Sequence, residues 1–244
     1  MIRFPYGISD FHRIRSDSYL YLDRTAHIAE LEEAGRQLIF LRPRRFGKSL
    51  WLSTLANYYD INTADEFKTL FGDLAVGQNP TPEHNQYLML RWDFSKVSGQ
   101  GDIEQIRQNL FNHINLSIKY FAARYAAYLQ AEVEVLDEDA LASVDSLANA
   151  VALSGQRIYL LIDEYDHFAN SILADDLKLF QRIMGKGGFV RSFYEVLKTA
   201  TQRGILDRLF ITGVTPIMLD SMTSGFNISQ NLSLHEDFNE AIGF

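Results

Sequence analysis

Short apolar runs alternate along the chain with longer segments in which apolar residues recur every three or four positions. This alternation is typical of βαβ units, which build a parallel sheet covered by helices on both faces. The run Ile158–Ile162 is apolar and uninterrupted, which predicts a central strand buried on both faces. Strands are predicted at Gln37–Leu41, Tyr87–Phe94, Arg157–Asp163, Arg208–Val214 and, on a weaker pattern, Asn227–Ser233.

Three stretches between these strands have the period of amphipathic helices. The longest extends from Ile103 to Tyr125, and Asp102 with Gln105 supplies a capping pair for its start. Glycine is a frequent C-terminal stop of helices. The two other stretches are Leu141–Val151, which is followed by Gly155, and Phe193–Ala200, which is followed by Gly204.

Composition and charge exclude several classes of protein and of chemical site. The 244 residues suffice for one large α/β domain. Without a Pro-, Gly- and Ser-rich linker, a single domain over 1–244 is the simplest interpretation. The absence of cysteine excludes disulfides, Cys-ligated zinc and thiol nucleophiles. The net charge of −8 argues against a surface that coats nucleic acid. With neither a signal peptide nor an apolar run of roughly 20 residues, we expect a cytoplasmic protein without a membrane partner.

The segment LRPRRFGKS after the first predicted strand carries the first candidate site. A stretch of helical spacing follows it, and a helix N-terminus offers unpaired N–H groups and a positive dipole end to a phosphate. Gly47 lets the main chain approach the anion, Lys48 reaches the outer phosphates, and the Ser49 hydroxyl is a ligand for Mg²⁺. The general phosphate-loop pattern has glycine where Arg42 stands, so the alternative is a surface turn with a solvated basic run.

Two more strand ends carry candidate side chains. Asp163 and Glu164 end the third predicted strand, and ligands bind at the carboxyl ends of strands in open α/β sheets. In a nucleotide hydrolase, Asp163 would hold the Mg²⁺ shell, and Glu164 would orient and deprotonate the attacking water. If the fourth strand lies between the first and the third, Thr212 points its hydroxyl at the γ-phosphate as a sensor. The alternative for Thr212 is a residue chosen for β propensity.

The segments RPRRFGKSL, IDEYD, FPYGISDF, YLYLDRT and ITGV together resemble the AAA-ATPase-like family, in which a P-loop ATPase domain usually precedes a PD-(D/E)XK nuclease-like domain. The likeness extends from Phe4 to about Phe244, and the Arg-rich loop is the family's own form of the phosphate loop. It implies an α/β P-loop NTPase fold of the ASCE, AAA-like type, with a parallel sheet of about five strands flanked by helices. Residues 1–35 are expected near the nucleotide. The nuclease-like domain is expected to be absent from this chain, so nuclease activity is not transferred.

The resemblance also implies an ATPase that uses ATP and Mg²⁺, with the loop as its Walker A motif and IDE as its Walker B motif. The catalytic residues are then Glu164, Lys48 and Thr212, and the Mg²⁺ residues are Ser49 and Asp163. The residues implied to contact ATP are Arg42, Pro43, Arg44, Arg45, Phe46, Gly47, Lys48, Ser49 and Leu50.

Two other functions use the same residues and stay open at this stage. One is a nucleotide-dependent switch that holds ATP or ADP with little turnover. The other is a binding module in which the RPRR cluster and Lys48 grip nucleic-acid phosphates, which the net charge of −8 disfavours. A homo-oligomer, a nuclease-like domain and nucleic acid are the partners considered for the full system. The six histidines lack the paired spacing of a transition-metal site.

Overall fold

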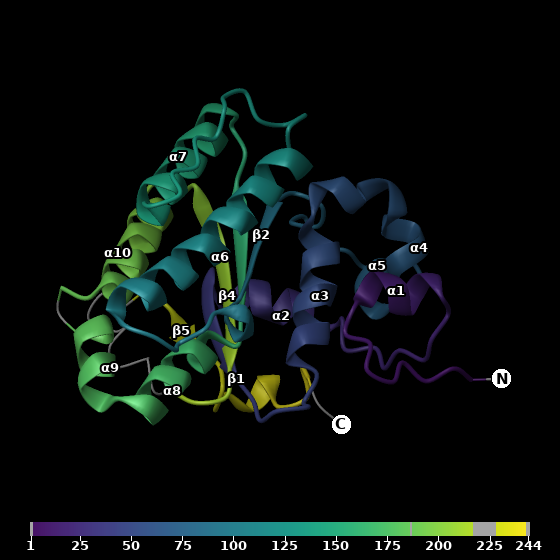
Figure 1. Ribbon diagram of the computed structural model, residues 1–244. Coiled ribbons are helices and arrows are strands. Elements are labelled where there is room, and N and C mark those ends of the chain that lie inside the picture. The colour runs from purple at the N-terminus through teal and green to yellow at the C-terminus, as the bar shows by residue number, and fades with distance from the viewer. Residues whose placement is uncertain (1, 186, 217–227, 243–244) are drawn as a thin grey trace.

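A sheet of five parallel strands forms the centre of the protein (Figure 1). The computed structural model describes residues 2–185, 187–216 and 228–242. The strand order is β2-β3-β4-β1-β5, so β4 is inserted between β1 and β3. The expected fold, an α/β P-loop NTPase-like sheet flanked by helices, is confirmed. The strands are β1 (Gln37–Leu41), β2 (Leu88–Asp93), β3 (Ile158–Asp163), β4 (Leu206–Gly213) and β5 (Gln230–Asn231).

Four of the predicted strands lie where the apolar runs place them. The only shift of note among these four is that β4 starts at Leu206 rather than at Arg208. The fifth strand is much shorter than the predicted range 227–233, whose first residue lies outside the described residues. The Asn231 side chain accepts a hydrogen bond from the main-chain N–H of Ser233 at 2.9 Å. Such a local turn competes with strand pairing and explains why β5 ends early.

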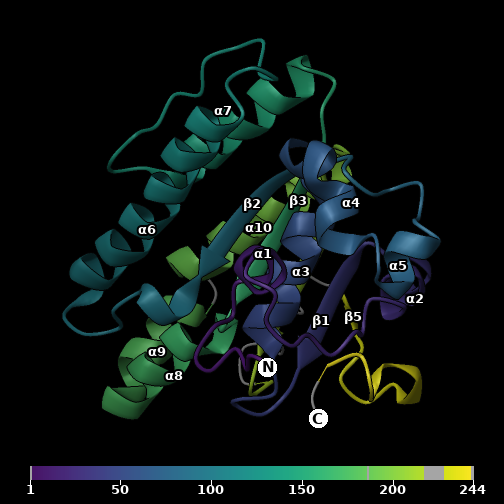
Figure 2. The same ribbon diagram turned by 90° about the vertical axis from the view of Figure 1, so that its right-hand side faces the viewer.

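Helices cover both faces of the sheet (Figure 2). The predicted helix over 103–125 is α6, and its capping box of Asp102 and Gln105 is confirmed. Within the described chain, no helix combines the length and the apolar character that crossing a membrane requires. One face carries α1 (Phe11–Ser16), α2 (His27–Ala34), α3 (Lys48–Tyr59), α4 (Phe67–Phe71) and α5 (Ala75–Gln78). The other carries α6 (Ile103–Arg124), α7 (Ala140–Leu153), α8 (Tyr165–Asp175), α9 (Leu177–Met184) and α10 (Phe189–Gln202). Short 3-10 helices are η1 (Ile61–Glu66), η2 (Phe94–Lys96) and η3 (Glu236–Phe238).

The side chains of β3 alternate between two hydrophobic cores, one on each face of the sheet. Ile158, Leu160 and Ile162 belong to the core under α6, α7 and α10. Tyr159 and Leu161 belong to the core under α3. The strand is therefore buried on both faces, as its apolar run predicts, and burial of this apolar surface is the main source of stability for such a sheet.

The N-terminal segment packs against α3. The ring of Phe11 in α1 stacks on that of Phe71 with centroids 4.8 Å apart, and the Phe11 N–H donates to Ser53 Oγ of α3 at 2.9 Å. The segment after β5 also lies close to the beginning of α3 (Figure 2). Both end segments of the described chain therefore lie beside the helix that follows the Arg-rich loop.

Candidate functional site

The carboxyl ends of β1, β3 and β4 meet at one edge of the sheet. The register pairs Leu41 of β1 with Gly213 of β4, and Ile162 of β3 with Ile211 of β4. The side chains and loops that follow these three strands therefore gather at one place. The loop from β1 crosses this edge and continues into α3, which begins at Lys48.

The loop reaches α3 through two residues in the left-handed region. Arg45 has φ 67° and Gly47 has φ 85°. A Cβ built on Gly47 would meet no atom within 4 Å, so the backbone conformation, and not crowding, favours glycine here. Gly47 is the N-cap of α3 and provides no side-chain cap. The N–H groups of the first turn are thus left for an anion, the arrangement found at phosphate sites.

The Lys48 ammonium lies in the hollow of the loop. The residue is 4 % exposed, and its Nζ donates to the carbonyl oxygens of Arg42 and Pro43, both at 3.1 Å. Glu164 Oε1 is 3.5 Å from the same Nζ. A buried ammonium needs such partners, and all three lie at the strand edge where the sequence places the site.

Asp163 joins the loop helix to β4. Its Oδ2 accepts a hydrogen bond from Ser49 Oγ at 2.6 Å. Its Oδ1 accepts from Thr212 Oγ1 at 2.6 Å and from the Glu164 main-chain N–H at 3.0 Å. Across the described residues, no Lys or Arg forms an ion pair with this carboxylate. Carboxylate and hydroxyl oxygens are ligands that suit Mg²⁺, so Ser49 and Asp163 fit the metal role expected of them.

Thr212 is completely buried at the end of β4. β4 lies between β1 and β3, the strand order that Thr212 needs in order to lie beside the loop and Asp163. Its hydroxyl, however, donates a hydrogen bond to Asp163 Oδ1. The structure therefore places Thr212 where it orients the carboxylate.

Glu164 has a strained backbone. Its φ of 51° and ψ of 42° put a non-glycine residue in the left-handed region, at the N-cap of α8. Such a conformation costs on the order of 1–3 kcal/mol and is frequent at functional sites. This left-handed conformation turns the chain sharply after Asp163 and places the Glu164 carboxylate near Lys48.

Arg42 does not direct its side chain at the hollow of the loop. Its guanidinium donates to the carbonyl oxygens of Ser233 at 2.7 Å and Phe238 at 3.2 Å, and it lies over the Phe40 ring at 4.2 Å. Burial lowers the pKa of this guanidinium. Arg42 is among the residues implied to contact ATP, but its side chain holds the C-terminal segment, and only its carbonyl oxygen faces Lys48.

The other loop residues lie on the surface. Arg44 and Arg45 are exposed, and among the described residues no hydrogen bond or ion pair involves either side chain. Leu50 is half-buried on the face of α3 that meets the N-terminal segment. The two arginines are therefore available to an anion outside the loop.

Asp166 is a site residue that the sequence analysis missed. It is 1 % exposed and accepts hydrogen bonds from the N–H groups of Val214 at 3.1 Å and Thr215 at 2.7 Å. A Cβ on Gly213 would come within 2.6 Å of its Oδ1 and within 2.5 Å of the Tyr165 ring. Asp166, the second aspartate of IDEYD, therefore packs against Gly213, the glycine of ITGV, and holds the end of β4 in place. The presence of both motifs in the sequence was the signal that could have identified Asp166.

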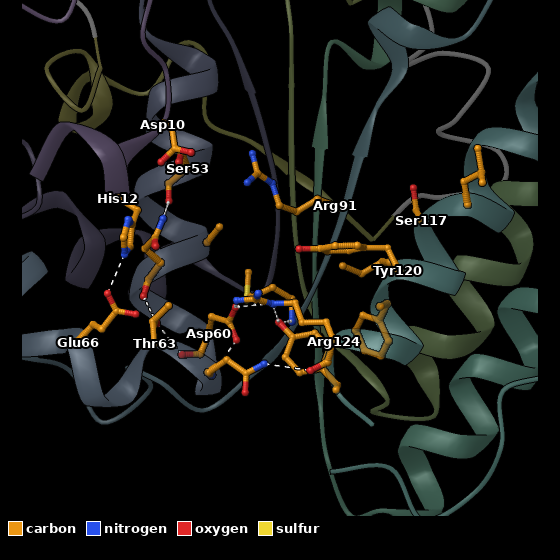
Figure 3. A pocket seen from close by; sticks show the side chains of 18 of the residues that line it. Asp10, His12, Ser53, Asp60, Thr63, Glu66, Arg91, Ser117, Tyr120 and Arg124 are labelled. Carbon is orange, nitrogen blue, oxygen red and sulfur yellow. Dashed lines mark hydrogen bonds and ion pairs between the residues drawn. The ribbon is translucent and has the colours of Figure 1, made fainter. Parts of the chain in front are cut away.

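A separate cavity of about 810 Å³ lies between α3 and α6 (Figure 3). Most of its charged side chains pair with one another: His12 Nε2 lies 2.7 Å from Glu66 Oε2, and Arg124 lies 2.7 Å from Asp60. Arg91 of β2 projects into the same space (Figure 3). Among the described residues, these two ion pairs account for four of the charged side chains in the wall, and Arg91 takes part in no ion pair.

Two comparisons relate the chain to known proteins. The model of a family described as "Predicted AAA-ATPase" matches residues 5–223. A protein of Azotobacter chroococcum mcd 1, described as "Uncharacterized protein in vnfD 5'region", is 27% identical over an alignment of 260 positions that spans 99% of this chain and 43% of the relative. The chain thus spans less than half of that relative's length. No solved structure matches the chain. Since the family match covers most of the sequence, the chain belongs to the family of predicted AAA-ATPases.

Proposed function

We propose that the chain binds ATP with Mg²⁺ at residues 42–50 and hydrolyses it to drive or switch an appended domain or partner. The observation that carries this proposal is the 2.6 Å contact between Ser49 Oγ and Asp163. It joins the first turn of the loop helix to the acidic end of a neighbouring strand. A metal-bound triphosphate needs both groups on the same side of the sheet.

The phosphates would bind at the beginning of α3. The uncapped N–H groups after Gly47 and the positive end of the helix dipole attract the anion. Lys48 would exchange the carbonyl oxygens of Arg42 and Pro43 for phosphate oxygens. This exchange is favourable because hydrogen bonds between two ionised groups are stronger than those to a neutral carbonyl.

The metal would be held by Ser49 and Asp163. When bound there, Mg²⁺ neutralises charge on the phosphate oxygens. Thr212 and the Glu164 N–H fix the Asp163 carboxylate by its other oxygen. The oxygen that faces Ser49 is therefore presented in one orientation.

Glu164 would orient and deprotonate the attacking water. Its Oε1 lies 3.5 Å from Lys48 Nζ, which forms an ion pair with it. Transfer of Lys48 to the phosphates removes that partner and leaves Glu164 to accept a hydrogen bond from water. Positioning and charge stabilisation of this kind are the main catalytic contributions in phosphoryl transfer.

Release of phosphate from ATP tests the proposal, with Lys48→Ala and Glu164→Gln as variants. Lys48→Ala is expected to lose nucleotide binding. Glu164→Gln is expected to bind ATP and to turn over roughly 10²-fold more slowly, the scale of losing a general base. Native turnover in Glu164→Gln contradicts the catalytic role. Saturable ATP binding without turnover in the native chain supports the switch instead.

The contacts of Arg42 weaken the nucleic-acid alternative. Arg42, one of the four cations proposed to grip phosphates, is occupied by Ser233 and Phe238. Binding to an oligonucleotide that weakens steeply with salt, together with no stabilisation by ATP·Mg²⁺, is the result that favours this alternative.

A further inference from the structure

Two hollows adjoin beside β2, the strand at one edge of the sheet. One is the cavity of about 810 Å³ between α3 and α6 (Figure 3). The other, of about 450 Å³, is lined by Ser49 and Asp163, the residues proposed to hold the metal. Three residues, Arg91, His113 and Ser117, line both hollows. The wide cavity at the edge of the sheet therefore lies next to the proposed phosphate site.

Arg91 lies where the two hollows meet, and its guanidinium has no partner. The register pairs Arg91 with Leu161, which packs in the core under α3, so the Arg91 side chain lies on the α3 face of the sheet. Asp163, two positions after Leu161, has its carboxylate on the same face. Within residues 2–185, 187–216 and 228–242, no hydrogen bond or ion pair involves the Arg91 side chain. This cation is therefore available to an anion on the face where the phosphate site lies.

The other cations of the two hollows already have carboxylate partners. Apart from histidines, the described walls contain two further cationic side chains, Arg124 and Lys96. Arg124 lies 2.7 Å from Asp60, and Lys96 lies 3.1 Å from Asp93. Arg91 is thus the one lysine or arginine of these walls whose charge is not already offset.

The main-chain N–H of Arg91 is a second free donor. Alternate residues of a parallel strand direct their N–H groups to the same side. On the open side of β2, the Met89 N–H donates to Tyr125 Oη at 3.0 Å. The Asp93 N–H donates to His113 Nε2 at 3.3 Å. The N–H of Arg91 lies between them in this series, and it has no acceptor among the described residues, so the edge of the sheet has a gap at this position.

We infer that Arg91 binds the inorganic phosphate that hydrolysis releases, and that the phosphate leaves the nucleotide site through these two hollows. The inference rests on the function proposed above. In that reaction water attacks the γ-phosphorus, Glu164 takes its proton, and the bond to the ADP oxygen breaks, which yields ADP and orthophosphate. Arginine binds phosphate oxygens through paired N–H donors. ADP would still occupy the beginning of α3, and the hollow beside Ser49 and Asp163 gives the phosphate a route that does not pass it.

The charges of the walls favour Arg91 as the place of the anion. Among the described residues that line the hollows, Asp10 and Asp163 are carboxylates without a cationic partner. Like charges repel, so an anion is disfavoured next to either of them and favoured at Arg91. Arg91 is itself exposed, and water can therefore take the phosphate from it.

Arg91→Ala tests the inference, because the side chain has no partner whose loss would affect the fold. Arg182→Ala is the matched control. Arg182 is also exposed, and in the described chain its side chain has no hydrogen bond or ion pair, but it lies on α9, on the other face of the sheet. Arg91→Lys keeps the charge and loses the paired donors.

Two measurements follow the phosphate. Calorimetry measures the affinity for inorganic phosphate of each chain saturated with ADP·Mg²⁺. A single turnover of ATP, followed with a fluorescent phosphate sensor and by acid quenching, separates phosphate release from bond cleavage.

The native chain with ADP·Mg²⁺ is expected to bind phosphate, and Arg91→Ala is expected to bind it roughly tenfold or more weakly, the scale of hydrogen bonds between charged groups. In Arg91→Ala, release slows while bond cleavage and ATP affinity stay native. Arg91→Lys recovers part of the phosphate affinity, and Arg182→Ala behaves as the native chain.

Equal phosphate affinity in Arg91→Ala and the native chain overturns the inference, as does a native chain that binds no phosphate beside ADP·Mg²⁺. Weaker binding of added phosphate with a native rate of release overturns the exit route and assigns the site to phosphate from solution. A native chain that cleaves no ATP refutes the hydrolysis proposed above, and with it the product as the source of the phosphate. The calorimetry with inorganic phosphate then still decides whether Arg91 is an anion site.

Discussion

Thr212→Val removes one hydroxyl from the centre of the site and keeps the shape of the side chain. Thr212 is fully buried, and its Oγ1 donates to Asp163 Oδ1 at 2.6 Å. The variant leaves that oxygen with the Glu164 N–H alone. We expect two effects: a loss of stability and a loss of turnover.

The magnitude follows from the type of hydrogen bond. A hydrogen bond to a charged group contributes about 1.5–3 kcal/mol. A protein of this size loses about 2–4 °C of melting temperature per kcal/mol, which corresponds to roughly 3–12 °C for Thr212→Val. If the same free energy orients Asp163 in the transition state, turnover falls roughly 10- to 150-fold.

Two control variants separate orientation from folding. Thr212→Ser keeps the hydroxyl and is expected to retain most of the turnover. Thr63→Val removes a buried hydroxyl that donates to the Asn57 and Asp60 carbonyls, away from the site, so it lowers the melting temperature and leaves turnover unchanged. Calorimetric melting and phosphate release measure both quantities. A Thr212→Val protein with native turnover and native melting temperature would refute the positioning role.

Other variants test the contacts around the site. Gly213→Ala places a Cβ within 2.5 Å of Tyr165 and 2.6 Å of Asp166, so we expect a loss of about 1–3 kcal/mol in urea unfolding; an unchanged midpoint contradicts the close packing. Arg42→Ala removes the guanidinium contacts with the C-terminal segment, and hydrogen exchange over 230–242 should accelerate while tripolyphosphate affinity changes little. Burial lowers the pKa of His113. Since the unfolded chain then binds its proton first, stability falls as pH drops below about 6.5, and this part of the fall should vanish in His113→Gln.

The strands and the core of the site could be predicted from the sequence for a physical reason. Buried parallel strands are short apolar runs, and their carboxyl ends share one edge of the sheet. This rule brings Asp163 and Thr212 to the beginning of α3 if β4 lies between β1 and β3, a strand order that the sequence left open and the structure shows. The contacts of 2.6 Å from Ser49 and Thr212 to Asp163 agree with it.

The remaining contacts depend on residues far apart in the chain. The orientation of Arg42 follows from Ser233, which lies 191 positions later. Asp207 is a buried carboxylate near the beginning of β4, and it accepts hydrogen bonds from Tyr87 at 2.8 Å and Arg157 at 3.1 Å. No local pattern carries such pairings, since they arise only when the sheet has assembled.

The most direct test of the central claim is a crystal structure with a non-hydrolysable ATP analogue and Mn²⁺, in which anomalous scattering locates the metal. The account predicts Mn²⁺ between Ser49 and Asp163, phosphate oxygens at the N–H groups after Gly47, and Lys48 turned from the loop carbonyls to the phosphates. A metal and triphosphate bound elsewhere, with Lys48 still held by Arg42 and Pro43, would contradict it.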